Sequence, residues 1–160
     1  MALRQTYLSM KRRLPDDAEV VLVMRGRGSD ELAPSNELLS DFNAAKEQCS
    51  EIESDPVKVY ECAWKRSDYE RRFRDEILKN PRSMARLERL AEESRRKDVF
   101  LICYESEDKP CHRRLLLSIA EERFGALIDA SPFQHQADAA DELKTTRQMS
   151  LLDEPSAHSE

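Results

Sequence analysis

Val99-Phe100-Leu101-Ile102-Cys103-Tyr104 is the clearest predicted strand in the sequence, an uninterrupted apolar run between Lys97-Asp98 and Glu105. Strands without polar alternation are typically buried on both faces of a sheet, as in parallel sheets covered by helices. Residues 19–24 form a second run of this kind. Helical patterns long enough to cross between such strands separate the two runs. The sequence therefore predicts an α/β fold, with a small, mainly parallel sheet flanked by helices.

The helices between these strands have recognisable starts. Ser35, which follows Leu32-Ala33-Pro34, is expected to cap a helix that ends near Cys49. Ser67-Asp68-Tyr69-Glu70 matches a capping box, which predicts the start of a second helix. Asn80-Pro81 ends that helix and begins another.

Shorter segments complete the predicted order of elements. Residues 6–10 and residues 57–60 are each predicted to form a short strand. A helix after the central run is expected to end at Gly125 in a left-handed cap, and residues 126–128 return to the sheet. Residues 1–129 are thus expected to form one α/β domain, and residues 130–160 a disordered acidic tail.

Composition restricts the class of protein. A chain of 160 residues with 26 Lys or Arg and 32 Asp or Glu suits one domain. No stretch approaches the ~18 to 20 apolar residues of a membrane helix, and Met1-Ala2-Leu3-Arg4 lacks the pattern of a secretory signal. We expect a cytoplasmic protein with no membrane partner, whose four cysteines are reduced. Cys49 and Cys62 are expected to be packing residues.

Charge is unevenly distributed along the chain. Residues 65–97 carry 12 Lys or Arg against 7 Asp or Glu, although the net charge of the whole chain is -6. Such a segment attracts phosphate-bearing partners or simply forms the solvated face of two amphipathic helices, and we favour the solvated face. Because the chain as a whole is acidic, any role in binding nucleic acid is local.

The side chains that carry chemistry gather at the carboxyl ends of the predicted strands, where ligands bind in open parallel sheets. Cys103-Tyr104-Glu105 ends the central strand, Cys111-His112-Arg113 opens the next helix, and Arg25 follows the earlier strand. The start of the helix adds free amides suited to an anion. Arg25-Gly26-Arg27-Gly28 lacks the third glycine of a dinucleotide fingerprint, so no Rossmann cofactor is predicted and the cofactor stays unknown.

Leu32-Ala33-Pro34-Ser35, Tyr69 with its following helix, and the two motifs Cys103-Tyr104-Glu105 and Cys111-His112-Arg113 occur in this order along the chain. In this combination the sequence resembles the family catalogued as domain of unknown function 488 (DUF488), over roughly residues 6–129. The resemblance implies a compact α/β fold and a shared polar site at these motifs. It implies no established reaction.

Four interpretations of the two motifs remain open. Cys103, Cys111 and His112 offer soft metal ligands, but their spacing matches no familiar zinc site, so no metal ligand is assigned. Cys103 and Cys111 are alternatively a redox pair. In an enzyme, Glu105 or His112 is the catalytic acid or base, and Arg25, Cys111 and Arg113 bind an anion. In a purely structural site, the cysteines are core residues and Glu105 pairs with Arg113.

The tail contains one apolar cluster, Gln148-Met149-Ser150-Leu151-Leu152. It looks like the short peptides, Gln-x-Ser/Asp-Leu-Leu/Phe, with which bacterial DNA polymerases and repair proteins hold the sliding clamp. A disordered segment of this kind presents Met149, Leu151 and Leu152 to a preformed groove, and the Gln148 amide fixes its register.

These features favour a protein that acts on nucleic acid or nucleotides in DNA metabolism and is recruited through its tail. Its expected substrates are single-stranded or damaged DNA or a nucleotide. The alternative is a binding module without turnover, which senses a small anionic metabolite through Arg25, Arg113 and the amides at the helix start. The sequence does not decide whether the protein is an enzyme.

Overall fold

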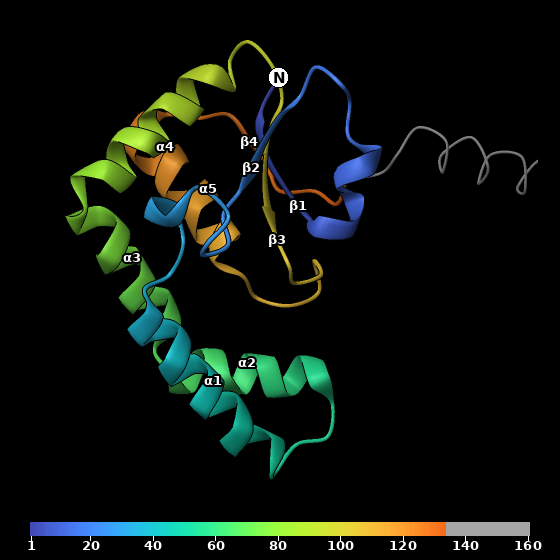
Figure 1. Ribbon diagram of the computed structural model, residues 1–160, viewed down its shortest axis with the longest axis vertical. Helices are drawn as coiled ribbons and strands as arrows, with labels where there is room; N and C mark the ends of the chain where they lie inside the picture. Colours follow the sequence, from blue (N-terminus) through green and yellow to red (C-terminus); the bar gives the residue numbers. More distant parts are fainter. Residues whose placement is uncertain (134–160) are drawn as a thin grey trace, which may run out of the picture.

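A four-stranded, wholly parallel sheet forms the centre of the computed structural model, which describes residues 1–133 (Figure 1). The strand order is β2-β3-β1-β4, with β1 at Leu3–Tyr7, β2 at Glu19–Leu22, β3 at Val99–Cys103 and β4 at Ile128–Asp129. The predicted α/β class and parallel pairing are confirmed.

The central run lies where its composition predicts. In β3 all five residues are buried, and Leu101 is paired with Gln5 of β1 on one side and with Val21 of β2 on the other. A strand with neighbours on both edges and cover on both faces has no solvated side, which explains why it lacks polar residues.

Five α-helices lie beside or beyond this sheet within residues 1–133. They are α1 at Asn36–Ser50, α2 at Pro56–Arg66, α3 at Tyr69–Lys79, α4 at Pro81–Glu93 and α5 at His112–Phe124. Figure 1 shows α5 against one face of the sheet with α4 outside it, and the 3-10 helix Leu8–Arg13 on the opposite side. Helices α1 and α2 form a hairpin beyond the end to which the β3 arrow points.

Most of the predicted element ends are confirmed. The Ser35 side chain accepts a hydrogen bond from the Leu38 amide at the start of α1, and the Asn80 side chain caps α4 in the same way. Gly125 takes the predicted left-handed conformation after α5, with a φ of 61°. The first strand begins earlier than expected and ends at Tyr7, because residues from Leu8 turn into the 3-10 helix.

The strand predicted at residues 57–60 is wrong, because these residues lie in α2. The Asp55 side chain accepts a hydrogen bond from the Val57 amide, and Pro56 occupies the first turn, so the helix has both of its usual starting signals. Tyr60 and Ala63 bury one face of this helix. Val57 and Val59 on either side of Lys58 resemble the apolar-polar alternation of a strand, but a helix accommodates so short a pattern equally well.

The capping box predicted at residues 67–70 is also wrong, although α3 does begin at Tyr69. Asp68 precedes the helix in a left-handed conformation, with a φ of 52° and no side-chain capping bond. The Ser67 hydroxyl instead donates to the Ala63 carbonyl at 2.7 Å. Ser67 therefore caps the end of α2. The chain turns directly from α2 into α3, so no side chain caps the start of α3.

Cys49 and Cys62 form a disulfide, which corrects the prediction that all four cysteines are reduced and that these two are only packing residues. The hairpin brings their Cα atoms to 6.1 Å, within the range that a disulfide spans. The prediction relied on cellular compartment alone and had no information about this proximity. The bond closes the hairpin of α1 and α2.

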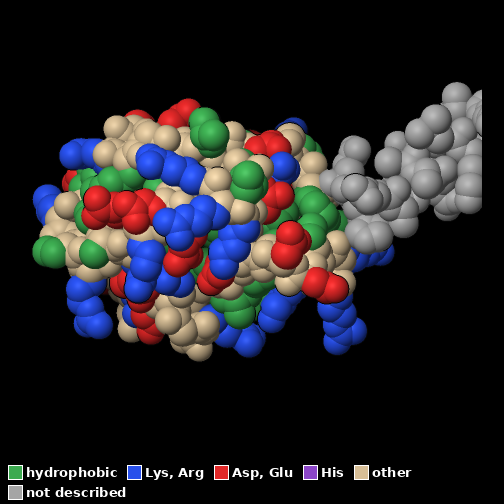
Figure 2. All heavy atoms as spheres, turned by 90° about the horizontal axis from the view of Figure 1, so that it is seen from above, with side chains coloured by type: hydrophobic (Ala, Val, Ile, Leu, Met, Phe, Trp, Pro, Cys, Tyr) green, Lys and Arg blue, Asp and Glu red, His purple; other side chains and the backbone are tan. Residues whose placement is uncertain are grey.

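The basic segment is paired with acidic groups rather than arranged as a uniform basic face. Arg72 contacts Asp41 at 2.7 Å, and Arg74 contacts Glu122 at 2.6 Å. Figure 2 shows Lys and Arg side chains interspersed with Asp and Glu over the face that it presents. No helix within residues 1–133 has the length and apolar character needed to span a membrane.

Candidate functional site

A pocket of about 180 Å³ lies between the carboxyl ends of β2 and β3 and the hairpin of α1 and α2. Polar groups of the β3 end and the α5 start form one part of its lining, namely Cys103, Glu105 and His112. The remaining lining comes from the β2 end, from α1 to α3 and from Tyr104: Met24, Arg25, Pro34, Leu39, Phe42, Asn43, Lys46, Tyr60, Tyr69 and Tyr104. Segments distant in sequence therefore build one site.

Aromatic rings form a continuous wall from the hairpin to this polar lining. Phe42 lies edge-on to Tyr60 with ring centroids 4.9 Å apart, and edge-on to Tyr69 at 5.3 Å. Trp64 stacks on Tyr69 at 4.2 Å and packs against the hydrophobic core. Contacts between rings hold both tyrosines in place and keep this side of the pocket apolar.

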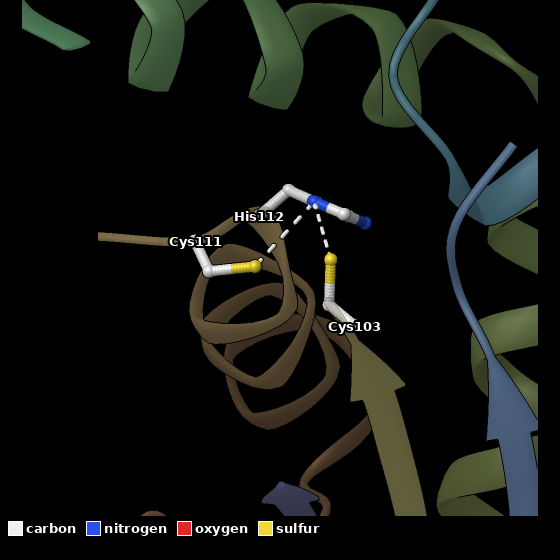
Figure 3. Close-up of side chains that lie close together, drawn as sticks. All are labelled: Cys103, Cys111 and His112. Atoms are coloured by element: carbon white, nitrogen blue, oxygen red, sulfur yellow. Dashed lines mark hydrogen bonds between the residues drawn. The ribbon is translucent and has the colours of Figure 1, made fainter. Parts of the chain in front are cut away.

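Two thiols and an imidazole converge beside the wall (Figure 3). Cys103 is the last residue of β3, while Cys111 and His112 lie at the start of α5. The His112 Nδ1 atom lies 3.6 Å from Cys111 Sγ and 4.0 Å from Cys103 Sγ. All three residues are buried, and their side chains point toward one another.

The orientation of the His112 ring is fixed from its far side. Its Nε2 atom lies 2.8 Å from the Val23 carbonyl oxygen, which only accepts hydrogen bonds. Nε2 therefore carries the proton, and in the neutral ring Nδ1 presents a lone pair to the two thiols.

Glu105 completes this cluster. One carboxylate oxygen accepts a hydrogen bond from Cys103 Sγ at 2.8 Å and lies 3.8 Å from Cys111 Sγ. Burial raises the pKa of Glu105, but the hydrogen bonds from Cys103 and Tyr60 and the adjacent His112 outweigh it, so the pKa lies below its usual range. Glu105 is thus a carboxylate held among proton donors.

The neighbouring acids are held in their neutral forms. The contact with Cys111, followed by burial, raises the pKa of the Cys103 thiol above its ordinary value. Burial, followed by the charge of Glu105, raises the pKa of Tyr60, and burial also raises that of Tyr69. Cys103 is therefore protonated, unlike the thiolate of a nucleophilic cysteine.

Arg113 does not lie in the pocket lining, although it adjoins His112 in sequence. Its side chain is fully buried, and its guanidinium donates to the backbone carbonyls of Glu105 at 2.7 Å, Thr6 at 3.2 Å and Ser106 at 3.2 Å. The expected pairing with the Glu105 carboxylate is therefore wrong, because that carboxylate faces the thiols instead. Arg113 fixes the loop between β3 and α5.

Arg25 does reach the pocket, where its Nε donates to the Pro34 carbonyl at 2.8 Å. The hairpin adds a cation that the sequence analysis did not identify. Lys46 Nζ lies 5.3 Å from the centre of the Phe42 ring and 5.6 Å from that of Tyr60. Lys109 approaches Tyr60 from the loop before α5 at 5.7 Å.

Tyr60 was not recognised as a site residue because the strand predicted at residues 57–60 hides α2. Lys46 lies on the predicted helix after Ser35, but no sequence signal indicates that this helix packs over the strand ends. The signal that identifies α2, Asp55 followed by Pro56, was present in the sequence. The predicted partner-binding residues Gln148, Met149, Leu151 and Leu152 lie outside the described residues.

Comparison with known protein families gives a match over most of the chain. A family model, DUF488-N3a, described as the active DUF488-N3 subclade, matches residues 11–124, which include the whole pocket lining. No curated protein matches the chain, and no solved structure matches it.

Proposed function

The chain belongs to the DUF488 family, and from that premise we propose that it is an enzyme acting on nucleotides, or on nucleotide units of single-stranded or damaged DNA. The observation that carries the proposal is the composition of one pocket. It joins a half-buried carboxylate, a buried imidazole and a buried thiol to aromatic walls and to cationic side chains. The description of the matching family model as active is in keeping with catalysis.

Each part of the pocket suits one part of a nucleotide. A base is planar and apolar on its faces, and it packs against rings such as Tyr60 and Phe42. Arg25 and Lys46 supply positive charge for a phosphate. A single-stranded or unpaired nucleotide fits this recognition, because its base is free to leave the stack.

Glu105 is the proposed catalytic base. Its carboxylate is ionised, lies in the pocket lining and accepts a proton from a bound water as the water oxygen forms a bond to the substrate. The bond between the substrate and its leaving group breaks in exchange, and the leaving group takes up the proton from Glu105. His112 is connected to this group through Cys103, whose Sγ contacts both side chains, while the far side of the ring is held by the Val23 carbonyl. The reaction class is therefore hydrolysis of a bond in the nucleotide.

Glu105→Gln tests this role. We expect the variant to bind nucleotides with similar affinity but to lose product formation by at least about a hundredfold, the usual contribution of a general base. The measurement is chromatography and mass spectrometry of nucleotides and single-stranded oligonucleotides after incubation with purified protein.

Glu107→Gln is the matched control, because it makes the same chemical change in the same loop but outside the pocket lining. Turnover that survives Glu105→Gln would contradict the assignment. The alternative, a binding module for a small anionic metabolite, predicts saturable thermal stabilisation by the ligand with no product from either protein. Arg113 cannot serve that module directly, since its guanidinium is buried among carbonyls.

A further inference from the structure

We propose that Cys103, Cys111 and His112 bind one zinc ion, and that the fourth position of this ion faces the pocket. The inference concerns the same pocket as the proposed function but does not require nucleotide turnover. Nothing in the spacing of the three residues along the chain suggests it. The site exists because the end of β3 and the start of α5 meet (Figure 3).

The separations between the ligand atoms suit a tetrahedral ion. Zinc binds thiolate sulfur at about 2.3 Å and imidazole nitrogen at about 2.0 Å, so sulfur and nitrogen ligands of one tetrahedral ion lie about 3.6 Å apart. The observed distances from His112 Nδ1 are 3.6 Å to Cys111 Sγ and 4.0 Å to Cys103 Sγ. All three ligand atoms lie within 4.8 Å of one another, so small side-chain rotations close the site.

The imidazole is already prepared as a ligand. Metal-bound histidines usually donate their second ring N–H to a carbonyl or carboxylate, which fixes the ring and leaves the other nitrogen free to bind. The Val23 carbonyl does this at 2.8 Å from Nε2.

The ligand set selects the type of metal. Two sulfurs and one imidazole nitrogen favour zinc over magnesium or calcium, which prefer oxygen ligands. Three protein ligands with an open fourth position are typical of catalytic zinc, whereas structural zinc is closed by four protein ligands. Cys103 and His112 line the pocket, so the open position faces the space that a substrate enters.

Zinc binding changes the hydrogen bonding of Glu105. Both thiols must lose their protons to solvent when zinc binds. Glu105 then loses the hydrogen bond that it now accepts from Cys103, and its carboxylate is left beside the open position. It is thus an outer group, placed to accept a hydrogen bond from water or substrate in the fourth position.

The test measures metal on the purified full-length chain. The reduced protein is incubated with Zn²⁺ or Co²⁺, desalted, and analysed for metal content and visible absorption. We expect one ion per chain and, for Co²⁺, the intense visible bands of tetrahedral coordination together with thiolate-to-cobalt charge transfer. Cys103→Ser, Cys111→Ser and His112→Gln should each abolish retention of the ion.

Cys49→Ser/Cys62→Ser is the matched control, since it removes the other two cysteines of the chain and should leave metal content unchanged. A second measurement needs no variant in the cluster. In this control protein only Cys103 and Cys111 remain, and Zn²⁺ should slow their alkylation at least tenfold, whereas Mg²⁺ should not.

Substoichiometric zinc that does not protect the thiols from alkylation would overturn the inference. Loss of bound zinc in the Cys49→Ser/Cys62→Ser protein would also overturn it, because the ion would then bind at those cysteines. The two proposals fail separately. Zinc retention without nucleotide products removes only the proposed function, and products formed by protein that takes up no zinc remove only the metal site.

Discussion

Arg113 supports the site from behind the pocket lining, where its charged side chain is fully buried. Its guanidinium links three carbonyls, two of them in the loop that carries Glu105 from β3 to α5. Arg113→Met removes these charge-assisted bonds and leaves buried carbonyls without donors. We expect the free energy of unfolding to fall by about 3 kcal/mol, measured by urea denaturation.

Arg114→Met is the control for this prediction, because Arg114 is exposed and contacts the Glu107 carbonyl at the surface. It should change the free energy of unfolding by less than about 0.5 kcal/mol. Equal effects of the two substitutions would contradict the role assigned to Arg113.

At the same scale, the sequence predicted which residues gather but not where each side chain points. Cys103, Glu105 and His112 were expected together because parallel strands end at one edge of the sheet. Arg113 was expected with them, yet successive residues of a helix point about 100° apart. The turn that directs His112 into the pocket therefore directs Arg113 toward the loop carbonyls.

Among the elements, the hairpin of α1 and α2 depends on its disulfide. The bond closes a loop between residues separated by 13 positions, which restricts the unfolded chain. Cys49→Ser/Cys62→Ser is expected to lower the free energy of unfolding by about 3 kcal/mol. Denaturation with and without reductant measures this, and the variant should lose the sensitivity to reductant that the parent protein shows.

The elements themselves were largely predictable where periodicity and end signals agreed. The starts of α1 and α4 and the end of α5 carried unambiguous residues, namely Ser35, Asn80-Pro81 and Gly125. Helix α2 was not recognised because three residues of apparent alternation outweighed Asp55 and Pro56. The disulfide was unpredictable for a different reason, since it depends on how two helices pack and not on either helix alone.

For the molecule as a whole, the open question is recruitment through the tail. We propose that Gln148, Met149, Leu151 and Leu152 bind a bacterial sliding clamp. Calorimetric titration of the full-length protein should show micromolar binding that Gln148→Ala/Leu151→Ala abolishes. Gln136→Ala/Leu143→Ala makes the same changes elsewhere in the tail and should leave binding intact. If the parent protein releases or absorbs no heat on titration with the clamp, the proposal is wrong.

The predicted cytoplasmic location stays a prediction.

The hairpin of α1 and α2 allows the ligand selectivity of such a pocket to change during evolution. The groups proposed to carry chemistry lie at the end of β3, at the start of α5 and in the loop between them, which the sheet and Arg113 immobilise. Phe42, Lys46 and Tyr60 instead lie on a separately closed pair of helices. Under the proposed function, reactivity and selectivity therefore reside on different parts of the chain. Exchange of a few hairpin side chains alters what the pocket admits while the reacting groups keep their geometry, so one chemistry can serve many ligands.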